Sequence, residues 1–174
     1  MKKVLVIAAV ALMVLGIVAP VSAQPAIHSI PFTTNLIADG RDTAKDVGDL
    51  KVDYSGTSLN VTYVIDEFGT DWRLAETHLY VGDSAPSKSS PGKFSYKHED
   101  LGDVLGDSYT VSLADMDLDE DGIVYIAAHA ELQQEVVIDD IPTTIYETAW
   151  AQGDYLIRLH ANWATYFVVE VSAP

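Results

Sequence analysis

The residues that could do chemistry fall into two groups, and the first is an acidic run before residue 122. Four carboxylates alternate with other residues there: Asp115, Asp117, Asp119 and Asp121. Carboxylates at alternate positions of a tight loop converge on one centre, and Gly122 allows the turn, so the run matches the first half of a calcium loop. The twelfth loop position, where a bidentate Glu belongs, is Ala128, which excludes a helix-loop-helix site. A β-type calcium loop and a plain acidic turn both stay open, and the residues favour the turn.

The second group consists of imidazoles and carboxylates inside apolar segments: Glu76, His78, His129, Glu131 and Glu147. In a strand, residues two apart lie on one face, so Glu76 shares a face with His78, and His129 shares one with Glu131. Imidazole and carboxylate together could hold a transition metal such as Zn²⁺ or act as an acid/base pair in a small metal-dependent hydrolase. The alternative is a buried polar cluster whose members bond one another, and it is favoured because such clusters are commoner.

Other signals of enzymes are missing from the chain. It has no Gly-x-Ser-x-Gly turn, no His-Glu-x-x-His pair, no glycine loop for phosphate and no cysteine. These absences favour a non-catalytic protein. Trp72, Trp150 and Trp163 could stack on sugar rings in a carbohydrate-binding module, but core packing explains all three equally well.

The elements that must position these residues are strands. Leu59, Val61, Tyr63 and Ile65 alternate with mostly polar residues, and the turn at 55–57 joins them to a similar run, so 47–65 is predicted to be a β-hairpin. Further strands are predicted at 72–81, 108–113, 122–137, 143–151 and 162–171. Short strands punctuated by Gly, Asp and Pro predict an all-β, single-domain sandwich or jelly-roll-like fold. The Ser-, Pro- and Lys-rich segment at about 82–93 is predicted to be a flexible surface loop.

The start of the chain predicts export. Lys2 and Lys3 precede the apolar run 4–18, and small residues at 21–23 fit a signal-peptidase site, so residues 1–23 are predicted to be a cleaved signal peptide. Residues 24–174 then form one domain, without stable membrane insertion after cleavage. The expected location is extracellular or at the cell surface, and the periplasm is also compatible.

The charge of the chain limits the classes of partner that it could bind. The chain has 26 acidic and 10 basic side chains, and cleavage would lower its net charge from −16 to −18. Such a surface repels phosphate, so nucleic acid is excluded as a partner and cations are favoured. Asn60 begins a glycosylation acceptor tripeptide on the polar side of its predicted strand.

Several segments together resemble an uncharacterised secreted β-rich module of bacterial and archaeal cell-surface proteins. They include Glu76-Thr77-His78-Leu79-Tyr80-Val81-Gly82, Pro91-Gly92-Lys93-Phe94-Ser95-Tyr96, Tyr125-Ile126-Ala127-Ala128-His129-Ala130, Glu147-Thr148-Ala149-Trp150 and Asn162-Trp163-Ala164-Thr165-Tyr166-Phe167. The resemblance covers most of the residues after the signal. It implies location and domain type and gives no reaction.

These observations predict a secreted or cell-surface module with a structural or adhesive role, with calcium as its candidate cofactor. The expected partner is an extracellular one, either a glycan or another copy of the chain. The alternatives are a carbohydrate-binding module and, less favoured, a hydrolase that uses His78, His129, Glu76 and Glu147.

Overall fold

The computed structural model describes residues 26–40, 43–67, 70–118, 120–159 and 163–171, and the predicted signal peptide lies outside them. The elements are β1 (Ile27–Ser29), β2 (Phe32–Ala38), β3 (Lys45–Tyr54), β4 (Ser58–Ile65), β5 (Arg73–Gly82), the 3-10 helix η1 (Pro91–Lys93), β6 (Tyr96–His98), β7 (Gly106–Ser112), β8 (Ile123–Ile138), β9 (Ile141–Ala151), β10 (Tyr155–Leu156) and β11 (Thr165–Glu170). The chain is an all-β, sandwich-like single domain, as predicted. In the described ranges no helix has the length and hydropathy needed to span a bilayer.

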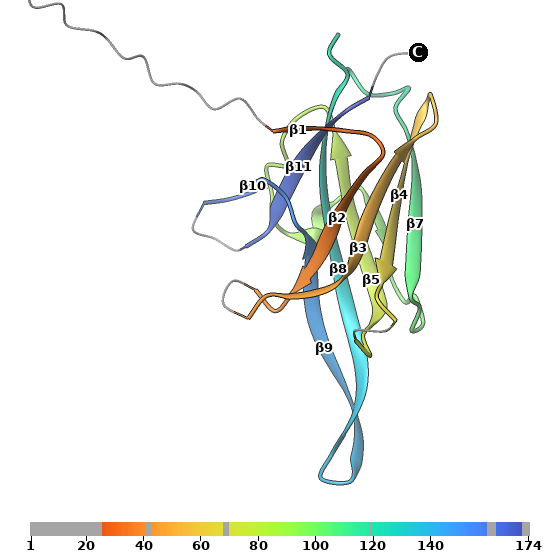
Figure 1. Cartoon of the computed structure of the whole chain (residues 1–174), viewed down its shortest axis with the longest axis vertical. Coiled ribbons are helices and arrows are strands. Elements are labelled where there is room, and N and C mark those ends of the chain that lie inside the picture. Colours follow the sequence, from red (N-terminus) through yellow and green to blue (C-terminus); the bar gives the residue numbers. More distant parts are fainter. Residues whose placement is uncertain (1–25, 41–42, 68–69, 119, 160–162, 172–174) are drawn as a thin grey trace, which may run out of the picture.

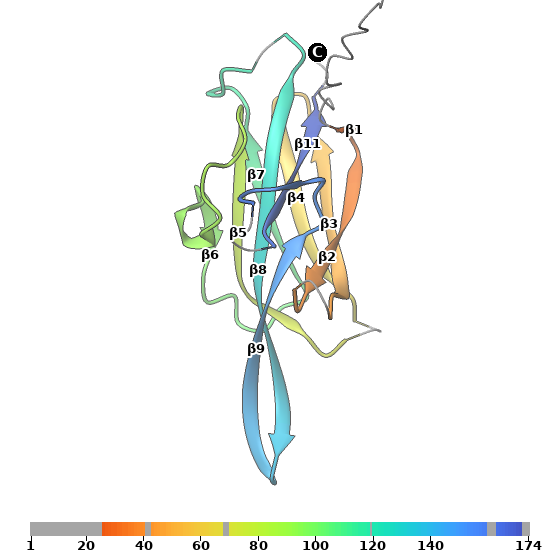
Figure 2. The same cartoon turned by 90° about the vertical axis from the view of Figure 1, so that its left-hand side faces the viewer.

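The strands pair in the order β1-β11-β8-β9-β2-β3-β4-β7. Off this path, β5 pairs with β8, and β6 pairs with β5. Figures 1 and 2 show that this path folds over into two layers. One layer holds β6, β5, β8, β11 and β9, and the other holds β2, β3, β4 and β7. All pairs are antiparallel except β1 with β11.

The core lies between the two layers. It is built from the alternate apolar residues of facing strands, and fully buried members include Leu50, Val61, Tyr63, Ile126 and Phe167. A second, smaller cluster of Phe94, Ala127, Trp150 and Ala164 lies on the outer side of β8 and β9. Each face of β8 therefore meets its own apolar layer over part of its length.

The hairpin predicted at 47–65 is confirmed by β3 and β4, and each other predicted strand corresponds to a strand of the structure. The sequence did not predict β1, β2, β6 or β10. These strands are short, or in β2 are interrupted by Thr33, Thr34 and Asn35, so they lack a clear apolar alternation. In the predicted loop, η1 covers residues 91–93 and Pro86 is buried.

The far ends of β8 and β9 form an arm that leaves the body. Within the described ranges, β8 pairs with β9 alone after Gln133, which itself pairs with Arg73, and β9 pairs with β2 from Ala149 onwards. Figures 1 and 2 both show this hairpin extending past the body, at the opposite end from β1 and the end of β11. Asp139 and Asp140, both at positive φ, make the two-residue turn at its tip. We call residues 134–146 the arm.

Candidate functional site

The pairing of β5 with β8 brings the two histidines together. His78 lies directly opposite His129, and Glu76 lies opposite Glu131. The Nδ1 atoms of His78 and His129 are 3.4 Å apart, and each residue is only 4% exposed. Four of the five residues in the predicted His/Glu group therefore meet on the outer face of the β5–β8 layer.

A β-bulge in β5 decides which side chains share this face. Leu74 pairs with Leu132 and Glu76 with Glu131, so Ala75 is an extra residue on β5. A regular strand would place Leu74 beside Glu76, as alternation along the sequence suggested. Because of the bulge, Leu74 enters the core with 0% exposure, while Glu76 points outward.

Glu147 does not join this group. It lies opposite Leu132, whereas Thr148 lies opposite Glu131. Successive residues of a strand point to opposite faces, so Glu147 is on the other face of β9 from Glu131. Its carboxylate accepts a hydrogen bond from the backbone N–H of Thr148 at 2.9 Å.

Glu99, and not Glu147 as predicted, lies close to Glu76 and His78. The short strand β6 pairs with β5, with Lys97 opposite His78, and Glu99 follows it directly. Ligand atoms of Glu76, His78 and Glu99 all lie within 4.8 Å of one another. The sequence missed Glu99 because a three-residue strand gives no periodicity. The acidic pair Glu99-Asp100 after Tyr96-Lys97-His98 was the available signal.

Burial and like charges set the protonation of the group. Burial, and then the nearby His78, lower the pKa of His129 to about 3. Burial also lowers the pKa of His78, although Glu131 and Glu99 oppose that shift. Burial raises the pKa of Glu76, and the neighbouring carboxylates, Glu131 first, raise it further. At neutral pH the histidine pair is uncharged and the acidic side chains around it repel one another.

An open depression gives this group contact with solvent. Its volume is about 330 Å³, and it is lined by Ala75, Glu76, Asp100, Gly102, Glu131, Gln133 and Tyr146. His129 lies on the other side of His78, where the ring of Trp150 packs against it with 4.9 Å between ring centroids. A ligand in the depression could therefore reach Glu76 and Glu131, while His78 and His129 are both buried.

Comparison with known protein families, characterised proteins and solved structures finds no match. The chemistry open to this chain is therefore argued from its own side chains. The His/Glu group offers one imidazole nitrogen and several carboxylate oxygens, which is a donor set for a cation. A general base among them would be Glu76, since His129 is buried and its pKa lies far below neutral.

A hydroxyl–carboxylate–imidazole network lies on the inner side of β5, β6 and β7. Thr77 donates a hydrogen bond to Asp107, and His98 Nδ1 is 3.0 Å from the same carboxylate. A hydrolytic triad needs the imidazole between hydroxyl and carboxylate, but here the carboxylate is in the middle. Thr77 is also 0% exposed. The network therefore serves to join the three strands.

The acidic run before Gly122 forms an exposed turn. Asp115, Asp117 and Asp121 are exposed, and Asp119 lies outside the described residues, so a calcium site here stays a prediction. Gly122 has φ of +64°, and a Cβ there would lie 2.2 Å from the carbonyl oxygen of Val171. The glycine is needed because β11 ends directly against this turn.

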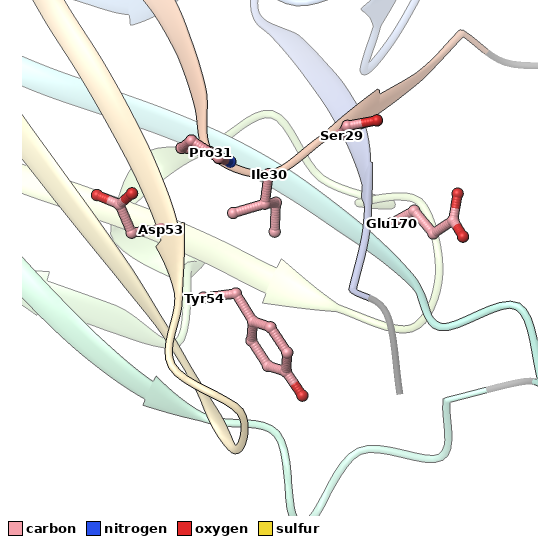
Figure 3. A pocket seen from close by; sticks show the side chains of 6 residues that line it. All are labelled: Ser29, Ile30, Pro31, Asp53, Tyr54 and Glu170. Atoms are coloured by element: carbon pink, nitrogen blue, oxygen red, sulfur yellow. The ribbon is translucent and has the colours of Figure 1, made fainter. Parts of the chain in front are cut away.

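Two other features bear on ligand binding. Trp150 is 4% exposed, so stacking on a sugar would fall to the partly buried Trp72 or Trp163. A hollow of about 420 Å³ lies beside the turn between β1 and β2, lined by Ser29, Ile30, Pro31, Asp53, Tyr54 and Glu170. Figure 3 shows the Asp53 and Glu170 carboxylates on opposite sides of this hollow, so they do not converge on one ligand.

Proposed function

We propose that the chain works outside the cytoplasm, secreted or at the cell surface, as a non-catalytic adhesive module that binds another macromolecule. The observation that carries this proposal is the arm, a hairpin that forms no strand pair with the described residues of the body and keeps large apolar side chains in solvent. A soluble domain rarely leaves such residues uncovered in a cluster unless they meet a partner.

The apolar residues occupy both faces of the arm. Ile138 and Ile141 face each other across the tip on one side, and Val137 lies on the other, with exposures of 51%, 63% and 71%. Tyr146, at 65%, continues the second face towards the body. A hairpin that is apolar on both sides is suited to insertion between two surfaces or into a groove.

The acidic charge of the arm and its surroundings indicates the chemistry of the partner. Between residues 131 and 151 the chain has five acidic side chains and no Lys or Arg. Two of them, Asp139 and Asp140, lie at the tip itself. Complementarity therefore favours a partner whose apolar groove is bordered by basic groups. It disfavours a second copy of this chain, because two acidic tips would repel each other.

The outer edges of the arm offer a second mode of contact. Residues 134–138 of β8 pair only with β9, so their other edge has free N–H and C=O groups among the described residues. Free edges can accept a strand from another chain. Apolar contact and strand addition would then act together at one place.

Photocrosslinking on producing cells tests the proposal. A photoreactive aromatic residue in place of Tyr146 should give an adduct with a surface or extracellular macromolecule, and Ile138→Asp with Ile141→Asp should abolish it. Leu159 is the matched control position, because it is 76% exposed but belongs to the body. Equal adducts from positions 146 and 159, or adducts unchanged by the Asp substitutions, would overturn the proposal.

A further inference from the structure

The structure places three ligand-bearing side chains around one point at the outer edge of β5 and β6. Glu76 Oε2 is 3.7 Å from His78 Nε2, and one ligand atom from each of Glu76, His78 and Glu99 lies within 4.8 Å of the other two. We propose that Glu76, His78 and Glu99 bind a divalent transition-metal ion of the zinc class. His78 Nε2 and one oxygen from each glutamate are the ligands.

His78 Nε2 is the atom that most needs a partner. The His78 side chain is 95% buried, since its relative exposure is 5%. Among the described residues its Nδ1 contacts His129, while Nε2 has Glu76 as its nearest charged neighbour, beyond hydrogen-bond distance. A buried polar atom without a partner carries a desolvation cost, which a metal ion at this place would remove.

The distances suit a metal after a small movement. Ligands at about 2.1 Å from a tetrahedral ion are about 3.4 Å apart. The 3.7 Å between Glu76 and His78 is close to this value, and Glu99 is the residue that must approach. Glu99 is exposed and pairs with Lys97 at 3.3 Å, an exposed ion pair that costs little to break.

The surrounding charge favours a cation. Glu131 and Asp100 add two more carboxylates beside Glu76, and Lys97 is the basic side chain that acts on the group. A divalent ion would offset the repulsion among these carboxylates. Three protein ligands would leave a fourth position for water, and Glu76 is the ligand that lines the open depression.

His129 acts in this site as a positioning residue. When Nε2 of His78 binds a metal, its Nδ1 carries the proton and must find an acceptor. His129 Nδ1, 3.4 Å away, is placed to be that acceptor. The contact of His129 with Trp150 holds the acceptor ring in place.

Metal titration of the chain recovered after export tests the site. After removal of metals with EDTA, Zn²⁺ binding is measured by calorimetry and Co²⁺ binding by its visible spectrum. We expect one ion per chain. Glu99→Gln should weaken Zn²⁺ binding at least about tenfold, since outer partners of ligands alone are worth 10- to 100-fold. Thermal unfolding in EDTA checks that this exposed substitution leaves the fold intact.

Two further variants test whether the ion binds at this site and not elsewhere on the chain. Glu147→Gln removes an acid of the same type on the other face of β9 and should leave Zn²⁺ affinity unchanged. His129→Gln should weaken it by roughly 10- to 100-fold and change the Co²⁺ spectrum. The proposal is overturned by absence of Zn²⁺ binding, by equal affinity of wild type and Glu99→Gln, or by Ca²⁺ competing as well as Zn²⁺. None of these variants changes a residue of the arm.

Discussion

At the scale of residues, the pair His78–His129 shows what a buried imidazole costs. Burial disfavours the charged form of both rings, the nearby His78 adds to this effect on His129, and the carboxylates near His78 oppose it only in part. In the unfolded chain both histidines titrate near 6.5. The folded state therefore binds fewer protons than the unfolded state below neutral pH.

This difference predicts a loss of stability in mild acid. The pKa of His129 is about 3 in the folded chain, so its contribution is full above pH 6.5 and falls as pH decreases towards 3. Between pH 7 and pH 5 the loss from this residue is about 2 kcal/mol. Urea unfolding in EDTA at the two pH values should show a smaller loss for His129→Gln than for wild type. The same loss in both proteins would show that His129 does not titrate as described.

Substitution of Gly122 is a single-residue change expected to lower stability. Gly122→Ala combines a positive φ with a Cβ that would lie 2.2 Å from the Val171 carbonyl oxygen. We expect a loss of about 3 kcal/mol or more in the free energy of unfolding. Gly56→Ala is the matched control, since φ there is +80° but nothing lies within 4 Å. Chemical denaturation should show the smaller loss for the control, and equal losses would exclude the clash with β11.

At the scale of elements, β8 organises the molecule. Its first residues pair with β11, its middle with β5 and its end with β9. Alternation along β8 was readable from the sequence, because Val124, Ile126 and Leu132 recur at even positions. Which strands flank β8 was not readable, since pairing depends on contacts between segments far apart in the chain.

The candidate site, too, could be predicted from the sequence only in part. Period two placed Glu76 with His78 and His129 with Glu131, which the backbone of each strand determines alone. Three features depend on register between strands: the bulge at Ala75, the place of Glu99 directly after β6, and the place of Glu147 on the other face of β9. Register is set by the whole set of pairs, so no single segment carries a signal for it.

The arm predicts that two parts of one strand respond differently to substitution. Val137→Ser with Ile141→Ser should change the free energy of unfolding by no more than about 0.5 kcal/mol per site, because both side chains are already in solvent. Leu132→Ala, on the same strand but 0% exposed, should cost about 3 kcal/mol. Chemical denaturation measures both. A large loss from the serine pair would mean that the arm is covered in solution.

At the scale of the whole molecule, acidic charge dominates. The whole chain has a formal net charge of −16 and no cysteine to form a disulfide, so mutual repulsion opposes the compact state. Packing of the two layers must overcome this repulsion without covalent help. Cations that gather at the surface reduce it, and a specific ion would do so at one place.

Calcium tests whether such an ion binds the turn before Gly122. If Asp115, Asp117, Asp119 and Asp121 hold calcium, the thermal midpoint should be higher in Ca²⁺ than in EDTA at equal ionic strength, since an ion that binds only the folded state stabilises it. The increase should disappear in Asp117→Asn and persist in Asp53→Asn, an exposed acid elsewhere. An equal increase in all three proteins would show general screening by divalent ions.

The parallel pair of β1 and β11 places both described ends of the chain at one pole and the arm at the other (Figure 1). Suppose the chain is tethered through its C-terminal side and held by the arm tip. Tension would then run from Val171 through the β11–β8 ladder and down the continuous strand β8. Because these strands are antiparallel and would be pulled from opposite ends of their shared register, the ladder would be loaded in shear, with its hydrogen bonds sharing the force. A protein joined in this way resists rupture better than one whose strands are peeled apart one bond at a time.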